Sequence, residues 1–336
     1  SATQDVAIDA YRIEIAEERL QAALAATYIF GYRLALLVAG AGALYLAEFW
    51  SWQVSYEVMA ALVGVGALTV LIVREPSVNH FAAAQDIAHE IEQEAAKLTH
   101  LNPRLARLVG WFYAAVAGPF LDFFRRYKEL ALVILLMVAV YRISDIAMGV
   151  MANPFYLDFM GFSKTQVADV TKIFGFFMTI AGSLVGGVMV VRYGVRRILL
   201  LGAIMTAATN LLFVVLAQYP PNIVTLAAVV SADNLSGGIA NVALIAWLSS
   251  MTSASFTATQ YALFSSLMTL PGKFLGGFSG IVVAGFGYAE FFLVAGIMGV
   301  PAILLAMFMI RNGHRLDALA PRNESKLDAE SESRSD

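Results

Sequence analysis

Residues 130–152 have the sequence LALVILLMVAVYRISDIAMGVMA, and this stretch decides the class of fold. A helix of this length, at about 1.5 Å per residue, crosses the roughly 30 Å hydrocarbon core of a bilayer. Two charged residues, Arg142 and Asp145, interrupt the apolar run, and Arg142 lies about 20 Å into it. A charge at that depth costs about 2.5–3.5 kcal/mol or more, so it usually faces a cavity and has a function. The stretch therefore predicts a membrane span that contributes to a polar interior.

The same apolar character extends along the whole chain. Of its 336 residues 59% are hydrophobic and 14% are charged, and the mean hydropathy is +0.71. A soluble domain typically holds about 25% charged residues. Eight apolar stretches are long enough to span a bilayer. They cover residues 22–47, 54–73, 130–152, 167–191, 198–217, 223–248, 258–286 and 289–310.

The N-terminal residues SATQDVAIDAY (1–11) have the pattern of the end of a further span. The chain begins at Ser1, without methionine and inside a helix-like run, so we expect preceding residues to be missing. The predicted fold of this fragment is therefore an all-α membrane protein, with eight full spans plus the end of a ninth.

The distribution of lysine and arginine indicates the orientation, because cytoplasmic loops carry an excess of both. With the C-terminus placed inside, 17 of the 22 basic residues fall on the cytoplasmic side and Lys164 alone lies outside. Residues 105–124 are apolar enough to form another span, which would reverse every later loop. Arg107, Pro119 and Asp122 favour instead a helix that lies in the cytoplasmic interface.

An internal repeat organises the predicted spans. Residues 5–11 align with residues 241–247, and Arg74 aligns with Arg311, at offsets of 236 and 237. Parallel repeats are one of the repeat types found in secondary transporters. The predicted domains are the end of an N-terminal six-helix half (1–74), a cytoplasmic linker with amphipathic or interfacial helices (75–128), a C-terminal six-helix half (129–311) and a disordered cytoplasmic tail (312–336).

A short loop carries a family signature. GVMVVRYGVRR (187–197) resembles the loop motif of the major facilitator superfamily, which has a Gly, an acidic residue, Arg-x-Gly and a basic pair. Val191 stands where the acidic residue is expected. A closer similarity is to the AmpG-type muropeptide permeases of that superfamily. It covers nearly all of the spans and is most specific in DNLSGG (233–238) and SFTATQYAL (255–263).

This resemblance implies a major facilitator superfamily helical bundle that imports anhydro-muropeptides together with protons. These solutes are cell-wall fragments made of N-acetylglucosamine, anhydro-N-acetylmuramic acid and a short peptide. The resemblance also implies the inner membrane of a Gram-negative bacterium. The expected partners are the muropeptide, protons and the lipid bilayer, with no nucleic acid, and we expect a monomer. Two alternatives stay open: a transporter of another organic anion or acyl-CoA-like solute, and a transporter-like sensor.

Signatures of an enzyme are missing from the sequence. The four histidines lie in predicted loops, and His89-Glu90 has no second histidine at the spacing that a zinc site requires. No phosphate-binding Gly-Lys-Ser/Thr loop occurs, which argues against an ATP-driven pump. We therefore expect no enzymatic activity, no cofactor and no metal.

Charged residues inside the spans are the candidates for the site. Arg142 and Asp145 are three residues apart and share a helix face. Asp145 is a candidate proton carrier and Arg142 a candidate ligand of a substrate carboxylate, with a structural ion pair as the alternative. Asp233 lies near the midplane with no basic residue within one turn, which suits a proton carrier; the alternative is a hydrogen-bonded partner of another helix. Asn234 follows it and is a candidate substrate ligand or a packing residue.

Three more basic residues are candidate substrate ligands. Arg33 and Lys273 occupy near-equivalent positions in the two repeats, where a pair of salt bridges is the alternative. Lys172 lies near the outer surface, where its ammonium group could instead reach the headgroups. Residues predicted to form a cytoplasmic gate or interface are Asp5, Asp9, Arg12, Arg192 and Arg196. The alternative is an interfacial salt-bridge cluster for the first three and an ordinary basic cytoplasmic loop for the two arginines of 187–197. Aromatic residues that could stack on a sugar, or simply pack, are Tyr141, Tyr156, Tyr261 and Trp247.

Overall fold

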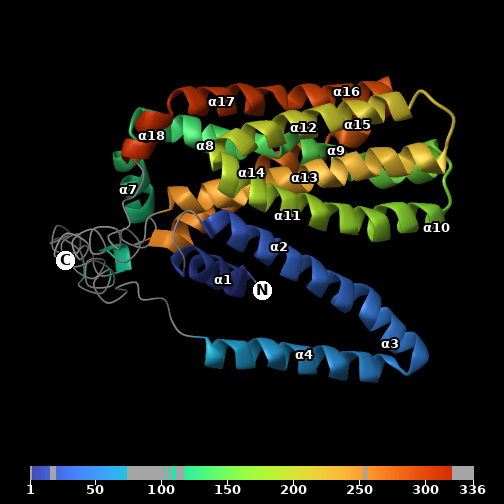
Figure 1. Cartoon of the computed structure of the whole chain (residues 1–336), viewed down its shortest axis with the longest axis horizontal. Coiled ribbons are helices and arrows are strands. Elements are labelled where there is room, and N and C mark those ends of the chain that lie inside the picture. The colour runs from blue at the N-terminus through green and yellow to red at the C-terminus, as the bar shows by residue number, and fades with distance from the viewer. Residues whose placement is uncertain are drawn as a thin grey trace.

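The structure is a computed structural model in which helices make up the described part of the chain (Figure 1). It describes residues 2–15, 20–73, 102, 105, 108–110, 117–252 and 256–319. Within these residues seven helices are long and apolar enough to cross a membrane. They are Trp52–Ile72, Glu129–Phe159, Thr165–Tyr193, Val195–Leu216, Ile223–Met251, Thr257–Phe286 and Tyr288–Arg311. The predicted class of an all-α, multi-pass membrane protein is confirmed.

The first part of the chain is a short helix followed by a helical hairpin. It consists of α1 (Ala2–Glu14), α2 (Gln21–Leu37), the π-helical turn η2 (Val38–Gly42), α3 (Ala43–Phe49) and α4 (Trp52–Ile72). The expected span over 22–47 is helical throughout, as α2, η2 and α3, although it is not among the seven helices above. Ser51 is the N-cap residue of α4, and its side chain accepts a hydrogen bond from the Val54 amide at 3.2 Å.

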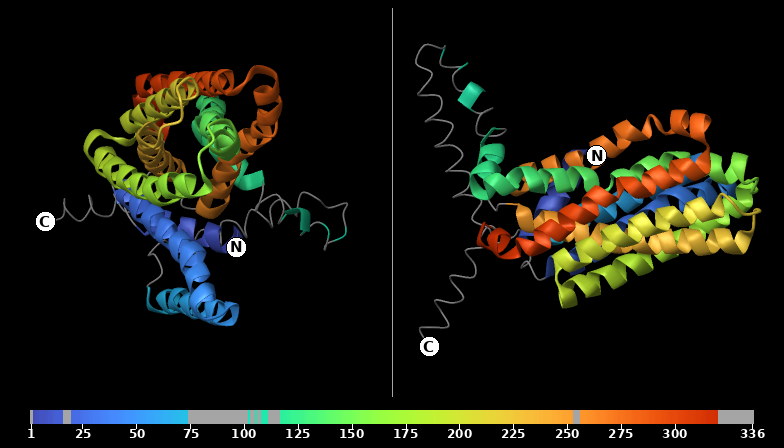
Figure 2. Two further views of the ribbon diagram at one scale, coloured as in Figure 1. Left: turned by 90° about the vertical axis from the view of Figure 1, so that its right-hand side faces the viewer. Right: turned by 90° about the horizontal axis from the view of Figure 1, so that it is seen from above.

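The second part is a bundle in which each of the six expected spans is found. Its elements are α8 (Glu129–Tyr141), α9 (Ile143–Pro154), η4 (Phe155–Phe159), α10 (Lys164–Val167), η5 (Ala168–Phe174), α11 (Gly175–Tyr193), α12 (Val195–Leu216), α13 (Ile223–Met251), α14 (Thr257–Gly276), α15 (Ser279–Phe286), α16 (Tyr288–Met298) and α17 (Val300–Arg311). Only α12 and α13 are unbroken. Viewed along the helices, α1, α2 and α4 lie on one side of this bundle (Figure 2, left).

Glycines bring α11 and α13 into close contact near the middle of the bundle. A Cβ atom built on Gly238 would lie 2.5 Å from the carbonyl oxygen of Thr179, and one built on Gly186 would lie 2.8 Å from the Cα of Ile239. No side chain fits at such distances, so the two backbones pack directly against each other. Small residues of this kind are typical of helix contacts in membranes, where apolar side chains gain little by leaving lipid for protein.

Two hydrophobic clusters fill the bundle. One lies around Trp247 and Phe264, with the ring centroids of Phe123 and Phe264 5.3 Å apart. The other lies around Phe155 and Phe292, whose ring centroids are 4.8 Å apart. The first cluster includes Tyr141 and the second includes Met148, so residues 142–147 lie between the two clusters along the chain.

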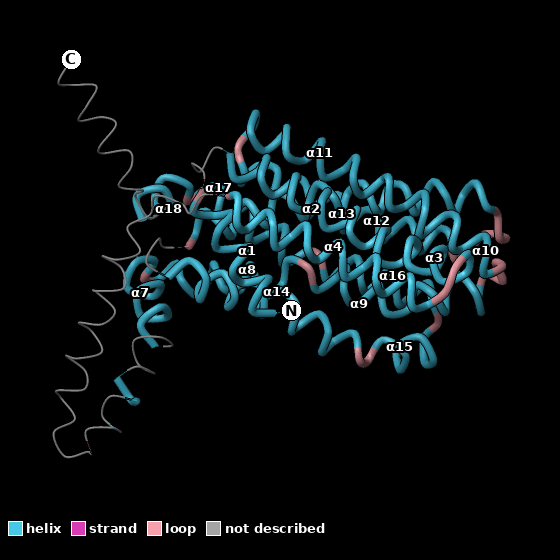
Figure 3. Tube along the Cα trace, turned by 90° about the horizontal axis from the view of Figure 1, so that it is seen from below, coloured by secondary structure: helices cyan, strands magenta, loops and turns pink. Residues whose placement is uncertain are grey.

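One end of the bundle is basic, and we call it the basic end. It carries the turn between α11 and α12 with Arg192, Arg196 and Arg197, the end of α17 with Arg311, and α7 (Gly118–Tyr127) with Arg125 and Arg126. Figure 3 shows α7 and α18 (Gly313–Leu319) at this end and α10 at the other. The described arginines named above therefore gather at one end of the bundle, as the predicted orientation of the spans requires.

The two parts of the chain touch near the basic end. A Cβ atom on Gly187 of α11 would lie 3.0 Å from the Cβ of Ala26 on α2. The buried residues of α2 all belong to its first nine positions and are Gln21, Ala22, Ala25, Ala26 and Ile29. Further along, Tyr32 is 58% exposed, and α2 diverges from α11 in Figure 1. The contact between the two parts is therefore concentrated toward one end of the bundle.

Two predicted segments fall wholly or in part outside the described residues. These are the amphipathic helix expected within the linker and residues 106–107 and 111–116 of the interfacial helix expected over 105–124, whose last part belongs to α7. The predicted disordered tail differs at its start, because residues 313–319 form α18 and Leu316 is buried. Residues 320–336 lie outside the described part.

Candidate functional site

The longest of the seven membrane-length helices, Glu129–Phe159, is interrupted near its centre by Arg142. Helix α8 ends at Tyr141 and α9 begins at Ile143, and Arg142 between them has φ −108° and ψ 5°. The Tyr141 hydroxyl donates to the carbonyl oxygen of Leu199 on α12 at 2.9 Å, which fixes the end of α8. The interruption therefore places a guanidinium at the middle of the bundle on a well-anchored backbone.

Arg142 binds two different helices. Its Nη2 donates to Asp145 Oδ2 at 2.8 Å, and its Nη1 donates to Asn241 Oδ1 on α13 at 2.9 Å. The Arg142 and Asp145 side chains are 30% and 21% exposed, so the pair is not sealed in the core. A guanidinium has five N–H donors, so this arrangement leaves a partly open cation that suits the recognition of a carboxylate.

Asp233 lies on α13 within electrostatic range of Asp145 and Arg142. Thr209 Oγ1 on α12 is 3.3 Å from Asp233 Oδ1 and also 3.3 Å from Ser236 Oγ. The structure thus brings together the candidate pair and the candidate carboxyl that lie about ninety residues apart in the sequence. Two carboxyl groups, Asp145 and Asp233, therefore lie in the neighbourhood of the Arg142 guanidinium.

Helix α12 contributes polar residues that sequence reasoning missed. Asn210 Nδ2 donates to Ser144 Oγ, and Ser144 Oγ donates to the carbonyl oxygen of Ala295, each at 2.5 Å. The signal in the sequence is TAATN (206–210), a polar stretch inside an otherwise apolar span. Asn241, which belongs to the repeat at 241–247, is also part of the site, and sequence spacing does not predict its bond to Arg142.

The other candidate ligands are distributed differently. Arg33 on α2 is half-buried and within electrostatic range of Arg142, so it belongs to the same region. Lys273 is exposed on α14. Asn234 lies against α11 instead, since its Oδ1 accepts from Thr179 Oγ1 at 2.8 Å. The side chain of Lys172, on η5, lies outside the described part of the structure.

A second polar site lies between the two parts of the chain, toward the basic end. The Arg12 side chain on α1 is only 5% exposed, and its Nε is 3.7 Å from Asp9 Oδ1. Its guanidinium carbon lies 5.8 Å from the ring centroid of Tyr28 on α2 and 5.4 Å from that of Tyr261 on α14. Asp5, one helical turn before Asp9 on α1, is exposed. Arg12 therefore joins α1 and α2 to the bundle.

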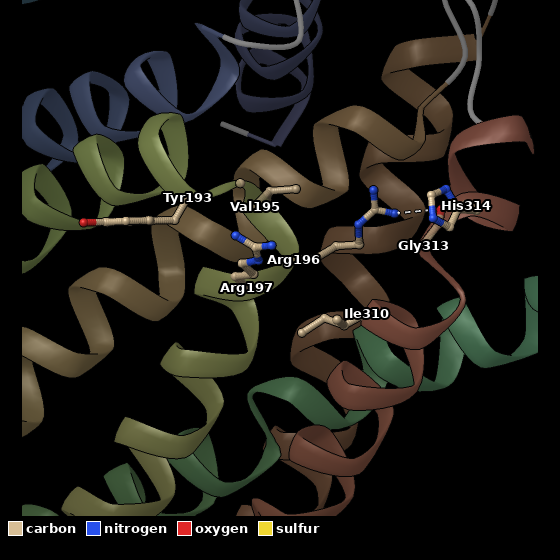
Figure 4. A pocket seen from close by; sticks show the side chains of 8 residues that line it. Tyr193, Val195, Arg196, Arg197, Ile310, Gly313 and His314 are labelled. Carbon is tan, nitrogen blue, oxygen red and sulfur yellow. Dashed lines mark hydrogen bonds between the residues drawn. The ribbon is translucent and has the colours of Figure 1, made fainter.

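The remaining gate candidates lie elsewhere on the basic end. Arg196 Nη1 donates to the carbonyl oxygen of Gly313 at 3.1 Å, so Arg196 contacts the start of α18 (Figure 4). Arg192 is exposed, with its guanidinium carbon 5.7 Å from the Tyr193 ring centroid. The structure does not bring these two arginines to the contact between the two parts of the chain.

The aromatic candidates for sugar stacking are enclosed in the bundle. Those with buried side chains are Tyr141, Tyr156, Tyr261 and Trp247. Tyr141 anchors α8 and Tyr261 packs on Arg12, as described above. In this arrangement the four rings serve packing and anchoring, and none is presented to a broad open surface.

These features define a class of protein. Membrane-length helices surround a buried polar network, charged residues lie at the centre of the spans, and two helical parts meet at one end. This arrangement is that of a multi-pass membrane transporter. The comparisons with known proteins give the family.

The Major Facilitator Superfamily model matches residues 133–333. The chain is 30% identical over 311 residues to the putative transporter AmpG 4 of Rickettsia felis, covering 92% of this chain and 69% of that protein. It is 30% identical over 308 residues to the anhydromuropeptide permease of Escherichia coli K12, covering 91% of this chain. It spans 57% of the length of that permease.

A solved structure shows the same fold. The proton:xylose symporter XylE, bound to 6-bromo-6-deoxy-D-glucose, superimposes with a TM-score of 0.60 at 18% identity, covering 90% of this chain and 66% of XylE. The chain belongs to the AmpG-type permease family of the major facilitator superfamily. Its relatives are permeases and not enzymes, as the sequence predicted.

Proposed function

We propose that the protein imports anhydro-muropeptides across the bacterial inner membrane, coupled to protons. The observation that carries this proposal is the cluster of Arg142, Asp145 and Asp233 at the middle of the bundle. Muropeptides present peptide carboxylates, which a partly exposed guanidinium binds well. The relatives named as AmpG transporters and as an anhydromuropeptide permease support the choice of substrate.

Coupling follows from the sharing of one cation by two carboxyl groups. When Arg142 binds a substrate carboxylate, less of its charge is left for Asp145 and Asp233. A proton taken up by Asp233 or Asp145 then restores charge balance in a region where unpaired charges are costly. Substrate and proton therefore stabilise the same loaded state, which is the requirement for symport. Arg33, within electrostatic range of Arg142, is a further ligand for an anionic group.

Alternating access requires the two parts of the chain to rock about the site. We place the basic end in the cytoplasm, because lysine and arginine accumulate in cytoplasmic loops. The contacts of α2 with α11 and of Arg12 with Tyr261 would then close the cytoplasmic side. Residues 1–74 would move against residues 129–311, with 75–128 as the connecting linker, in a monomeric unit.

Uptake by the whole protein in proteoliposomes tests the substrate. Labelled N-acetylglucosaminyl-anhydro-muropeptide should accumulate, and unlabelled muropeptide should compete while xylose should not. Arg142→Lys keeps the positive charge but loses the planar guanidinium, which donates to both Asp145 and Asn241. It should reduce uptake at least about tenfold, because hydrogen bonds to charged groups contribute about 1.5–3 kcal/mol. Arg125→Lys on α7, an exposed arginine at the basic end and outside the cluster, is the matched control.

The alternatives give different results. Competition by acyl-CoA or another organic anion, with no competition by muropeptide, would transfer the assignment to that solute. Saturable binding of muropeptide without any uptake, by protein that remains folded, would indicate a sensor. Either outcome would contradict the proposed transport of muropeptides.

A further inference from the structure

A basic pocket opens at the basic end, away from the polar network at the centre of the bundle. It has a volume of about 440 Å³ and lies between the α11–α12 turn and the junction of α17 with α18 (Figure 4). The residues that line it are Tyr193, Gly194, Val195, Arg196, Arg197, Ile310, Gly313 and His314. The pocket thus combines basic side chains with the apolar walls of two spans that end there.

The charged side chains that line this pocket are basic. Arg196, Arg197 and His314 line it, and Arg311 and Arg315 flank it in the sequence. The sequence has no acidic residue from 175 to 216, nor from 300 to 316. The position where the motif of 187–197 has an acidic residue holds Val191, in the last turn of α11, and this residue is 57% exposed. The elements that build the pocket therefore concentrate positive charge, and the one carboxylate on α18, Asp317, is not among the lining residues.

The pocket is held in shape by a contact between its two walls. Arg196 Nη1 donates to the carbonyl oxygen of Gly313 at 3.1 Å, which fixes its guanidinium across the start of α18. A Cβ atom on Gly313 would lie 3.3 Å from that nitrogen, so a larger residue would crowd the contact. Leu316, buried at the next turn, holds α18 against the bundle. Like charges are therefore kept together on ordered elements and not on a free loop.

We propose that this pocket binds the phosphate of an acidic phospholipid headgroup. Guanidinium groups form short, charge-assisted hydrogen bonds with phosphate oxygens, often two at a time. Basic pockets at the cytoplasmic ends of membrane helices are suited to anionic headgroups. A lipid is the source because α11 ends at Tyr193 and α17 ends at Arg311, at the level where headgroups lie. The exposed side chains of Val191 and Ile310 can pack beside the acyl chains.

The bound phosphate would tie the α11–α12 turn to α18 and offset the repulsion between Arg196 and Arg197. This role is independent of the transported solute, because none of the lining residues belongs to the central network. The site therefore stands even if the transported substrate proves to be another anion.

Native mass spectrometry of the whole protein tests the proposal. The protein is released from nanodiscs that contain phosphatidylglycerol and phosphatidylethanolamine with identical acyl chains. The wild type should retain phosphatidylglycerol preferentially. Arg197→Gln should lower that retention about fivefold, and Arg196→Gln/Arg197→Gln about twentyfold. Arg125→Gln on α7 removes the same charge outside the pocket and should leave retention unchanged.

Three results would overturn the proposal. They are equal retention of the two lipids by the wild type, equal loss in the Arg125→Gln control, and full retention in Arg197→Gln, which removes an exposed side chain and should not disturb folding. A last arm separates lipid from a soluble anion. If excess inorganic phosphate thermally stabilises the lipid-free wild type but not Arg197→Gln, and no lipid is retained, the site belongs to a soluble phosphate instead.

Discussion

Arg12 carries its charge in an almost fully buried position between two helices of the first part and one helix of the second. Three groups stabilise it: Asp9 at 3.7 Å and the rings of Tyr28 and Tyr261 at 5.8 and 5.4 Å. Cation–π contacts contribute most when water is excluded, at about 2 kcal/mol or more. Because Tyr261 belongs to α14 whereas Arg12, Asp9 and Tyr28 belong to α1 and α2, the share that Tyr261 contributes exists only while the two parts of the chain are in contact.

Replacement of Arg12 should therefore open the basic end. In Arg12→Gln we expect a cysteine placed at the buried Ala22 to react about tenfold faster with a membrane-impermeant maleimide, because a contact of about 2 kcal/mol is lost. The sequence contains no other cysteine, so the label reports one position. Arg12→Lys, which retains a cation, is the control and should show a smaller increase. Unchanged labelling in Arg12→Gln would show that the aromatic contacts do not hold this end closed.

At the scale of single residues, the sequence predicted the local contact of the site but not the contacts between distant helices. The i,i+3 spacing predicted the Arg142–Asp145 pair, which forms at 2.8 Å, because that contact is local. The partners Asn241 and Thr209 come from distant helices, and their approach depends on how α12 and α13 pack. Local patterns cannot specify such contacts. The roles of these residues in transport stay predictions.

At the scale of helices, the α11–α13 contact is the tightest of the bundle. Gly182 and Gly238 allow it, since any side chain there would meet the backbone of the facing helix. Gly237, the next residue to Gly238, has no heavy atom within 4 Å of a Cβ built on it. The two neighbouring glycines therefore form a natural matched pair in which only one supports packing.

Gly238→Ala should destabilise the protein and Gly237→Ala should not. We expect Gly238→Ala to lower the free energy of unfolding by about 1–3 kcal/mol, as overpacking does. Gly237→Ala should change it by less than about 1 kcal/mol, since only helix propensity is affected. Thermal unfolding of the two variants in the same detergent measures the difference. Equal melting temperatures would show that α11 and α13 are not in backbone contact.

The helices themselves were largely predictable and their interruptions were not. Apolar length identifies a span, so the six spans between 130 and 310 were expected and are found. The break at Arg142 contains no proline or glycine, and it depends on side-chain bonds to other helices. Likewise, α7 is held by Gln260, whose Nε2 donates to Asp122 Oδ2 at 2.8 Å and to the Pro119 carbonyl oxygen at 3.0 Å. These contacts connect residues about 140 apart in the chain.

At the scale of the whole molecule, the proposed rocking has to break the contact between the two parts at the basic end. Ala26 and Gly187 face each other there, with Cβ positions 3.0 Å apart. We expect a disulfide between Ala26→Cys and Gly187→Cys to form readily and to abolish uptake. Reduction should restore uptake, and each single-cysteine variant should remain active. Full uptake by the oxidised double variant would show that transport does not require these helices to separate.

The measurement that tests the central claim most directly is uptake of labelled anhydro-muropeptide by the whole protein in vesicles, with and without a pH gradient. It compares the wild type with Asp233→Asn and with Asp158→Asn, which alters an exposed carboxyl on η4. We predict gradient-driven accumulation by the wild type and Asp158→Asn. Asp233→Asn should lose accumulation while it still exchanges substrate across the membrane. Accumulation by Asp233→Asn equal to that of the wild type would contradict a proton carried at Asp233 in the Arg142 cluster.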